Sequence, residues 1–468
     1  MTARSRKTAP VHSPFDGREV GVVELSTGED VERAIAVGHA AAEANRRKPR
    51  PRHLAIAILE KAAVAIAEGA ERLARLIEGE AGKPIAAARL EVARCIDTLT
   101  IARDVARTAE GQLVELGAFA ASADRIALAR RVPVGLVSAI TPFNFPLNLV
   151  AHKLAPAIAA GCPVVLKPSP QAPLSAFALG EILWNAGLPR DHLSIVAASN
   201  EDASPLVTDA RPRLLTFTGS AAVGWALRAR SGEKRCTLEL GGNAAVIVHD
   251  DADLEHATAR IVAGAFGYAG QSCISVQRIY AHRAIHDELR TRLFDATARL
   301  VVFDPARDEC VCGPVIDDTA VRRISDVVRE AVAAGARLSR PFEVQGKTIA
   351  PFFLEGVPPA ARAVSEELFA PGAILEPYDH LEQALDRADA GKYGLQAGIF
   401  TRDLGRVMRA WERLEVGAVI HDDVPTFRAD AMPYGGVKGS GVGREGPSSA
   451  FAEMTEPRLL LLRNVIGS

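Results

Sequence analysis

The segment VGLVSAITPFNFPLNLVAHKLAPAIAAGCPVVLK, residues 134–167, is the part of the sequence that predicts the fold. Its two ends, 134–140 and 163–167, are short apolar runs with the length and composition of buried strands. Between them, 147–160 has the apolar spacing of a helix, and Gly161 follows at a position where glycine commonly ends a helix. A strand, a helix and a second strand of these lengths predict a βαβ unit with parallel strands.

The same alternation continues towards the C-terminus. The helix-like run 173–186 is followed by Gly187 and by three more strand-like runs. This order predicts a parallel, doubly wound sheet of the α/β class, which binds ligands beyond the carboxyl ends of its strands. The further strands are expected at HLSIVAA (192–198), LLTFT (214–218) and TLELGG (237–242), and the motifs at the strand ends are TPFNFP (141–146), KPSP (167–170), FTGS (217–220) and LELGGN (238–243).

A second α/β pattern begins at Ala244, and it contains the stretch GYAGQSCISV, residues 267–276. We expect the preceding helix to end at Gly270, with Cys273 in a turn before the next strand. A thiol on such a turn is exposed and close to backbone N–H groups, which suits a nucleophile, although a lone cysteine is often a small buried hydrophobe. The elements expected here are strands at 244–250 and 276–282 and helices at 253–268, 286–299, 320–334 and 380–389.

The N-terminal region reads as four helices that pack on one another, with no evident chemistry. They are expected at 29–48, 52–69, 71–81 and 86–111, where apolar positions recur three and four residues apart. Two strand-like segments stand apart from the α/β pattern: RIALARRV (125–132) and the apolar RLLLLRNVI (458–466). We expect the latter to pair with a distant segment of the chain or with another subunit.

Composition excludes several classes of function. The 468 residues are enough for two or three domains, and a net charge of -2 offers no electrostatic basis for binding nucleic acid or an anionic membrane. No apolar run has the length of a membrane span or of a secretory signal. The six cysteines are scattered, which indicates a reducing, cytoplasmic compartment, and Cys310 and Cys312 alone do not indicate a metal site.

Seven motifs occur in one order along the chain: TPFNFP, KPSP, FTGSAAVG, LELGGN, GQSCIS, EELFAP and PYGGVKGSGVGREG. In this order and spacing the chain resembles the NAD(P)-dependent aldehyde dehydrogenase superfamily over essentially its whole length. It is most similar to the branch with lactaldehyde, phosphonoacetaldehyde and non-phosphorylating glyceraldehyde-3-phosphate dehydrogenases. The resemblance implies a Rossmann-like cofactor domain (1–120 and 134–240, with 425–446 returning to it), an α/β catalytic domain (241–424) and oligomerisation strands (121–133 and 447–468) that form a homodimer or homotetramer.

The resemblance also implies a mechanism. Cys273 would add to the aldehyde to give a thiohemiacetal and then a thioester, and Glu239 would activate the water that hydrolyses it. Asn144, with the backbone N–H of Cys273, would hold the developing oxyanion. Taken alone, Glu239 could equally be a solvated or ion-paired carboxylate at a strand end, and Asn144 could be a structural turn residue.

The cofactor would be NAD or NADP. The G-x-G-x-x-G fingerprint is absent from the expected turns, and FTGSAAVG would instead bind the pyrophosphate at a helix N-terminus. Pro170 stands where NAD-preferring relatives often carry a glutamate, so a barrier to NADP is missing and the preference stays open. The residues implied for cofactor binding are Ile140, Thr141, Phe143, Lys167, Ser169, Pro170, Gly219, Ser220, Gly241, Glu367 and Phe369.

The expected substrate is a small, polar or anionic aldehyde. Arg428 or Arg103 could bind its anionic group, with Ser272 and Ile274 beside the nucleophile, although Arg428 could instead form an ion pair. Two other functions are alternatives: a CoA-acylating semialdehyde dehydrogenase and a non-catalytic structural or binding protein of the family. The first usually lacks the base at Glu239 and the second usually lacks that base or the cysteine, so the sequence favours hydrolysis.

Overall fold

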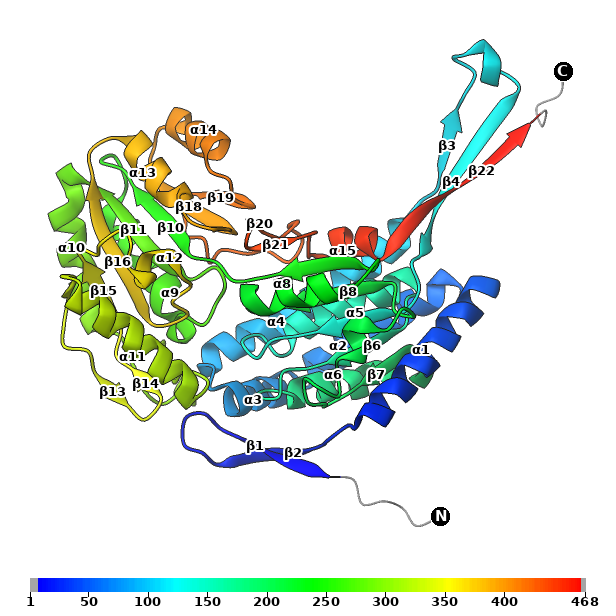
Figure 1. The fold of residues 1–468 in the computed structure, drawn as a ribbon, viewed down its shortest axis with the longest axis horizontal. Helices are drawn as coiled ribbons and strands as arrows, with labels where there is room; N and C mark the ends of the chain where they lie inside the picture. Colours follow the sequence, from blue (N-terminus) through cyan, green and yellow to red (C-terminus); the bar gives the residue numbers. More distant parts are fainter. Residues whose placement is uncertain (1–6, 464–468) are drawn as a thin grey trace.

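The computed structural model describes residues 7–463, and three larger β-sheets divide this range into three parts (Figure 1). Two parts are built on sheets of six and seven strands, and the third is a three-stranded arm that projects away from them. An N-terminal hairpin of β1 (Thr8–His12) and β2 (Glu19–Glu24) contacts helix α3 (Ala70–Ala81). Within the described range, no helix combines the length and the apolar character needed to cross a bilayer.

The six-stranded sheet has the order β21-β9-β8-β5-β6-β7, and its five longer strands are all parallel. The chain winds outward from β5 through β6 and β7, and then builds β8 and β9 on the opposite side of β5. This confirms the doubly wound sheet predicted from the sequence. The strands are β5 (Val137–Ile140), β6 (Val164–Lys167), β7 (Leu193–Ile195), β8 (Leu214–Thr218), β9 (Arg235–Glu239) and the antiparallel edge strand β21 (Gly441–Val442).

Helices cover both faces of this sheet because successive side chains of a strand point to opposite sides. In β6, Val164 and Leu166 belong to a core shared with α2, α4, α5 and α6, whereas Val165 packs against α1. The helices predicted in this part are confirmed, with ends within three residues of those expected. They are α1 (Gly28–Arg47), α2 (Arg52–Glu68), α3, α4 (Ile85–Thr108), α5 (Asn148–Ala160) and α6 (Leu174–Asn185), followed by α7 (Pro205–Thr208) and α8 (Ala221–Arg230).

The seven-stranded sheet has the order β12-β15-β16-β11-β10-β18-β19 and is parallel except for the edge strand β12. Helices α9 and α10 share a core with one face of the sheet, and α13 and α14 share a core with the other. This confirms the second α/β region. Its elements are β10 (Ala244–Val248), α9 (Leu254–Phe266), β11 (Val276–His282), α10 (Arg283–Ala298), α11 (Asp318–Ala333), β12 (Arg337–Leu338), β15 (Phe352–Glu355), β16 (Gly372–Tyr378), α13 (Leu381–Asp389), β18 (Gln396–Phe400), α14 (Leu404–Arg413) and β19 (Ala418–His421).

The arm consists of β3 (Gln112–Glu115), β4 (Arg125–Pro133) and β22 (Thr455–Arg463), in the order β22-β4-β3. Strand β22 pairs with β4 along its whole length. The apolar C-terminal strand therefore pairs with a distant segment of the same chain, one of the two expected alternatives, and residues 464–466 of that prediction lie outside the described range. Several leucines of the arm remain exposed: Leu113, Leu128, Leu459, Leu460 and Leu461.

Short segments connect the two large sheets. Residues 240–243 run from β9 to β10, and the chain later returns through β20 (Val437–Lys438) and β21, which adds to the edge of β9. As a result, the carboxyl ends of β8 and β9 face the segments that precede β11 and β16. The remaining short strands and α-helices are β13 (Val344–Gln345), β14 (Thr348–Ile349), β17 (Tyr393–Gly394), α12 (Arg362–Ser365) and α15 (Pro447–Glu453).

Candidate active site

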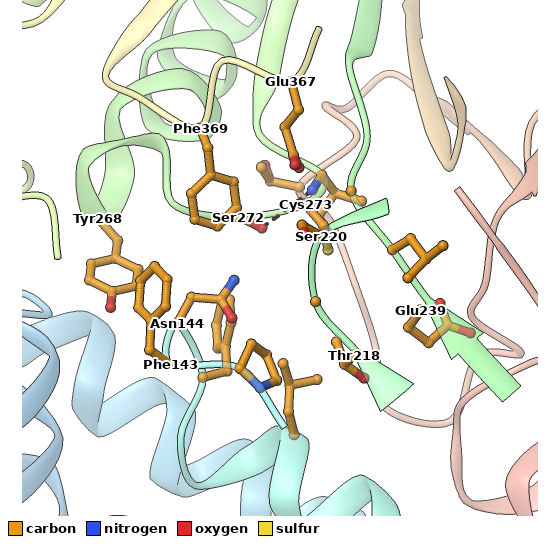
Figure 2. A pocket seen from close by; sticks show the side chains of 18 of the residues that line it. Phe143, Asn144, Thr218, Ser220, Glu239, Tyr268, Ser272, Cys273, Glu367 and Phe369 are labelled. Carbon is orange, nitrogen blue, oxygen red and sulfur yellow. Dashed lines mark hydrogen bonds between the residues drawn. The ribbon is translucent and has the colours of Figure 1, made fainter. Parts of the chain in front are cut away.

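A cavity of about 890 Å³ lies between the two large sheets (Figure 2). Asn144 enters it from the segment after β5, Cys273 from the turn before β11, and Glu239 from the end of β9. Three separate elements thus bring the residues predicted for catalysis to one cavity. Ser272 and Ile274, which were expected beside the substrate, also line it.

The turn that carries Cys273 begins earlier than the sequence predicted. Helix α9 ends at Phe266 rather than at Gly270, and Tyr268, Ala269 and Gly270 all adopt left-handed backbone angles, with φ of 52°, 54° and 67°. The first two carry side chains, so each costs about 1–3 kcal/mol of strain. In the sequence, the apolar spacing of a helix continues through this segment. In the structure, the backbone reverses direction here and passes close to the main chain at Ala370. At Gly270 a Cβ atom would collide with the carbonyl of Ala370.

Side-chain hydrogen bonds hold this strained turn. The hydroxyl of Tyr268 donates to the carbonyl of Ala81 at 3.1 Å. The side chain of Gln271 donates to the carbonyl of Pro314 at 3.2 Å and accepts from the N–H of Ile316 at 2.9 Å. Since these partners lie on different elements, the backbone on which Cys273 sits is held in one position.

Cys273 is half-buried, and it alone of the six cysteines lines the cavity. Its removal from water raises the pKa of the thiol to about 12, an effect that a hydrogen bond with the Tyr434 hydroxyl opposes. The distance between Cys273 Sγ and Tyr434 Oη is 2.9 Å. The thiol is therefore protonated in the resting site and needs a base or a favourable charge to react.

Asn144 and Glu239 are both buried, with 5% and 3% exposure, and both have polar atoms without a hydrogen-bond partner in the described structure. These atoms are Oδ1 of Asn144 and both carboxylate oxygens of Glu239. Burial, followed by repulsion from Glu445, raises the pKa of Glu239 well above its usual value. Unpartnered buried polar groups that line a cavity indicate that a ligand or water is their partner.

Arg428 lines the same cavity, and its charge is balanced by a buried carboxylate. Its guanidinium donates to Glu445 at 2.7 Å, and it lies 3.9 Å from the ring centroid of Tyr434. The ion pair that the sequence left open is therefore present. The Nε atom of Arg428 is buried and has no partner among the described residues, so part of the group stays available to a ligand.

Arg103 does not line the cavity, in contrast to the expectation. It lies near the C-terminal end of α4 and pairs with Asp104 at 2.9 Å. Only the first half of this helix reaches the cavity, where it contributes Arg94. The guanidinium of Arg94 binds both carboxylate oxygens of Asp430, at 2.8 and 2.9 Å. On this helix, Arg94 lines the cavity and Arg103 does not.

Part of the predicted cofactor set lines the cavity. Ser220 precedes α8 without forming a side-chain cap, and the first turn of the helix has no acidic residue, so its N–H groups can donate hydrogen bonds to an anion. The carboxylate of Glu367 accepts from the N–H of Gly242 at 3.0 Å, and a Cβ atom at Gly241 would collide with it. Predicted cofactor residues in the lining are Phe143, Gly219, Ser220, Gly241, Glu367 and Phe369.

The other predicted cofactor residues, Ile140, Thr141, Lys167, Ser169 and Pro170, lie outside this lining. Ile140 and Lys167 are the last residues of β5 and β6 and pair with each other, and Thr141, Ser169 and Pro170 follow these strands. Lys167 is only 6% exposed, burial lowers the pKa of its amine, and within the described range this side-chain amine has no hydrogen bond or ion pair. An unpaired amine at the carboxyl edge of a parallel sheet is in the region where such sheets bind nucleotides.

Some residues of the site were not singled out from the sequence. Lys83 lies in the short connection between α3 and α4, Arg94 lies on α4, and Tyr434 and Glu445 belong to the PYGG motif region. Tyr434 and Glu445 both lie within the motif PYGGVKGSGVGREG, which was the available signal for them. The roles of Lys83 and Arg94 depend on contacts between segments far apart in the sequence.

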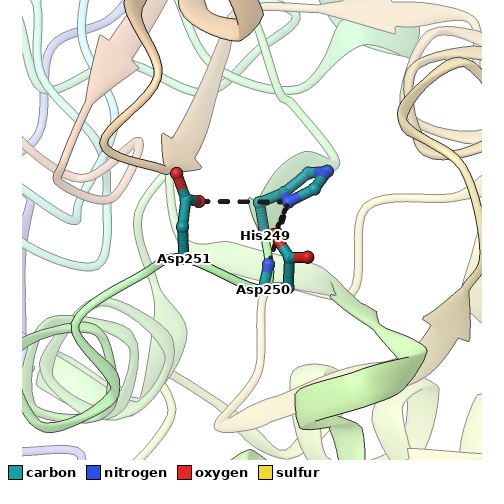
Figure 3. A group of neighbouring side chains, drawn as sticks. All are labelled: His249, Asp250 and Asp251. Carbon is teal, nitrogen blue, oxygen red and sulfur yellow. Dashed lines mark hydrogen bonds and ion pairs between the residues drawn. The ribbon is translucent and has the colours of Figure 1, made fainter.

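A cluster of His249, Asp250 and Asp251 has the composition of a metal site but lies outside the cavity lining (Figure 3). His249 Nδ1 is 2.5 Å from a carboxylate oxygen of Asp250, and Asp251 accepts from the hydroxyl of Thr401 at 2.8 Å. Arg406 also pairs with Asp251 at 3.1 Å. Since the ligand atoms already have partners and a cation is adjacent, we assign no metal here.

Comparison with known proteins gives one consistent result. The profile described as "Aldehyde dehydrogenase family" matches residues 1–460. The chain is 39% identical to 3-sulfolactaldehyde dehydrogenase of Priestia aryabhattai over 94% of this chain and 92% of the relative. It is 40% identical to aldehyde dehydrogenase 21 of Physcomitrella patens, solved with the reaction product succinate, with a TM-score of 0.97 over 100% of this chain and 97% of that one. It is 34% identical to the glyceraldehyde-3-phosphate dehydrogenase GapN of Methanocaldococcus jannaschii, solved with NADP, with a TM-score of 0.93 over 98% of this chain and 100% of that one.

Proposed function

The chain belongs to the aldehyde dehydrogenase family, and from this premise we propose that Cys273, Glu239 and Asn144 oxidise a small anionic aldehyde to its carboxylate. The protein is an oxidoreductase that uses NAD or NADP. We assign these three residues because their side chains line one cavity, and because Asn144 and Glu239 have buried polar atoms without a hydrogen-bond partner among the described residues.

The first step would form a bond between Cys273 Sγ and the aldehyde carbon. The thiol proton would pass to solvent water as the thiolate forms, the C=O π bond would break as the S–C bond forms, and the carbonyl oxygen would become an oxyanion. Asn144 is suited to stabilise it because its amide is held in the cavity before the substrate arrives. Oxidation of this adduct leaves a thioester on Cys273.

Glu239 would act in the second step. As a carboxylate it takes a proton from water, the hydroxide adds to the thioester carbon, and the carbon–sulfur bond breaks. The products are the carboxylic acid and the Cys273 thiolate. A raised pKa suits this role because a carboxylate with a higher pKa is the stronger base once ionised.

The residues present fit a dinucleotide. The uncapped first turn of α8 suits a pyrophosphate, Glu367 is positioned to accept from ribose hydroxyls, and Lys167 offers an unpaired amine. When bound, the nicotinamide supplies a hydride acceptor. Phe143 and Phe369 meet edge to face, with ring centroids 6.1 Å apart, and would shield this end of the cavity from water.

We propose that Arg94 and Arg428 recognise the anionic group of the substrate. Both guanidiniums line the cavity, and Arg428 keeps a free Nε. The relatives named above act on aldehydes that carry a sulfonate or a phosphate, and one is solved with a dicarboxylate product. Arginine suits all three groups because its planar donors match carboxylate, sulfonate and phosphate oxygens.

We also propose that the three-stranded arm joins subunits into a homodimer or homotetramer. Leu459 and Leu460 are neighbours on β22, so they point to opposite faces, yet their exposure is 61% and 54%. Apolar surface on both faces of a projecting sheet calls for a covering partner. The six free cysteines support a reducing compartment, which we propose to be the cytoplasm.

The test of this function compares Cys273→Ala with the native enzyme on a small aldehyde that bears a carboxylate and on its neutral analogue. Cys273→Ala should bind the cofactor and abolish turnover of both. Arg94→Gln should lower kcat/KM for the anionic aldehyde about 10- to 100-fold, which corresponds to about 1.4–2.8 kcal/mol, and change the neutral one much less. Substantial turnover by Cys273→Ala would refute the nucleophile, and equal losses on both aldehydes would refute the anion site.

A further inference from the structure

We propose that Tyr434 activates the nucleophile: its hydroxyl donates a hydrogen bond to Cys273 Sγ, and the guanidinium of Arg428 on the ring face strengthens that donor. This rests on the proposed function in one respect, that Cys273 is the nucleophile. Tyr434 touches the reacting atom; Arg428 contacts the ring of Tyr434, so in this step it is a positioning residue, in addition to its proposed contact with the substrate anion.

The position of the Tyr434 hydroxyl is closely restrained. Its Oη atom is 2.9 Å from Cys273 Sγ, and no other hydrogen bond of this hydroxyl occurs in the described part of the chain. The side chain is 3% exposed and packs with Ile274 and Leu395. On the main chain, Tyr434 and Glu445 exchange two hydrogen bonds, at 2.9 and 2.6 Å. The hydroxyl therefore has one partner and little freedom to turn away from it.

The chemistry of the reacting state decides the direction of this bond. A thiol can donate or accept, but a thiolate has no proton, so a bond to the thiolate must be donated by the phenol. Burial raises the pKa of Tyr434 well above its usual value, so the phenol keeps its proton at neutral pH. The bond thus favours the thiolate over the thiol, because hydrogen bonds to ionised acceptors are the stronger ones.

The other charges around the sulfur make this donor important. Glu239 and Glu367 interact unfavourably with a thiolate at Cys273, and Arg428 is the cation that interacts favourably with it. Burial adds to the unfavourable side. Two carboxylates and the loss of water thus oppose ionisation of the thiol, and one guanidinium and one phenol favour it.

Arg428 is placed to act through the phenol ring. The centre of its guanidinium lies 3.9 Å from the ring centroid of Tyr434, within the range of a cation–π interaction. Its NH2 group is held by Glu445 at 2.7 Å, and the side chain of Glu445 also lies 3.7 Å from the amine of Lys153. A cation on the ring face withdraws electron density from the phenol, which makes its O–H a better donor. Tyr434 itself gains and loses no proton in this role.

The experiment measures alkylation of Cys273 by iodoacetamide as a function of pH, without aldehyde, and follows the Cys273 peptide by mass spectrometry. Tyr434→Phe should lower the rate about 10- to 100-fold at a fixed pH near 8, and shift the whole profile up by about 1–2 pH units. Tyr280→Phe is the matched control: it removes another buried phenol, which bonds to the carbonyl of Arg387 at 3.4 Å, and should leave the profile unchanged. An unchanged profile in Tyr434→Phe would overturn the proposal.

A second variant avoids any change in packing. Fluorotyrosine at position 434 makes the phenol more acidic, so the alkylation profile should move to lower pH in step with the number of fluorines. Arg428→Lys should slow alkylation in the native background but have little further effect in Tyr434→Phe, if the guanidinium acts through the phenol. Additive effects of the two substitutions would refute that coupling.

These measurements are separate from the proposed function. Alkylation needs no turnover, so a shifted profile together with an active Cys273→Ala enzyme would refute the nucleophile but keep the Tyr434 interaction. An unshifted profile together with an inactive Cys273→Ala enzyme would keep the nucleophile and refute the role of Tyr434.

Discussion

The side-chain amide of Asn144 donates a hydrogen bond to the main-chain carbonyl of Gln271 at 3.0 Å, and this joins the segment after β5 to the turn that carries Cys273. An amide nitrogen has two N–H groups, so one remains available for a negative charge that develops in the cavity. The bond also restrains the distance between this donor and the sulfur. The Asn144 side chain is therefore already positioned to donate a hydrogen bond to an oxyanion before any substrate binds.

We expect Asn144→Ala to slow the first turnover about 10²- to 10³-fold, since it removes one donor to the oxyanion. Affinity for the cofactor should change little. Rapid-mixing measurements of NAD(P)H formation test this. Asn45→Ala is the matched control, because Asn45 is also a buried amide that donates to a main-chain carbonyl, that of Gly161 at 3.1 Å, but it lies outside the cavity lining. A native first-turnover rate in Asn144→Ala would argue against the oxyanion role.

Glu239→Gln should separate the two halves of the reaction. The first turnover should still give a burst of NAD(P)H, whereas the steady-state rate should fall about 10²- to 10⁴-fold, the usual contribution of a positioned base. Glu239 is active as a carboxylate, and its pKa is raised, so the steady-state rate of the native enzyme should fall as pH decreases through that raised pKa. Glu239→Gln should lose this pH dependence. If the burst disappeared together with turnover, Glu239 would be needed before the thioester forms.

Pro170 predicts tolerance of NADP. It is exposed after β6, close in sequence to the unpaired Lys167, and offers no carboxylate to repel a 2′-phosphate. Pro170→Glu should shift the ratio of kcat/KM towards NAD by about one to two orders of magnitude, or about 1.4–2.8 kcal/mol. Pro170→Ala separates the loss of the proline from the gain of charge and should leave the ratio nearly unchanged. If Pro170→Glu also left it unchanged, another residue would set the preference.

The exposed leucines of the arm predict association through it. Leu459→Asp combined with Leu461→Asp places charge on one face of β22, where the native side chains are 61% and 45% exposed. The oligomer should dissociate to monomers in light-scattering measurements, since burying these carboxylates in an interface is unfavourable. Val64→Asp, at a 55% exposed apolar site on α2, should leave assembly unchanged. An intact oligomer with both arm substitutions would exclude this face as the contact.

The main features of the fold could be read from the sequence because they depend on local patterns. The strands, the helices and their order follow from the spacing of apolar residues within short windows of sequence. This spacing does not depend on contacts with distant segments. The motifs around Cys273, Glu239 and Asn144 likewise identified the candidate residues. The predicted C-terminal end of α9 was wrong because the backbone reverses at Tyr268 and Ala269. This reversal depends on partners in other segments of the chain, such as Ala81.

Only the tertiary structure decided which charges and hydroxyls meet. The sequence determined that Arg428, Glu445 and Tyr434 exist near one another in the chain, but their pairing depends on how residues 422–446 fold against the cavity. The choice between Arg94 and Arg103 depended on which half of α4 reaches that cavity. The contact between Tyr434 and Cys273 joins the segment between β19 and β20 to the turn before β11, and it has no local signal. Spacing along the chain encodes secondary structure, whereas the chemistry of a site depends on distances of a few ångströms between remote residues.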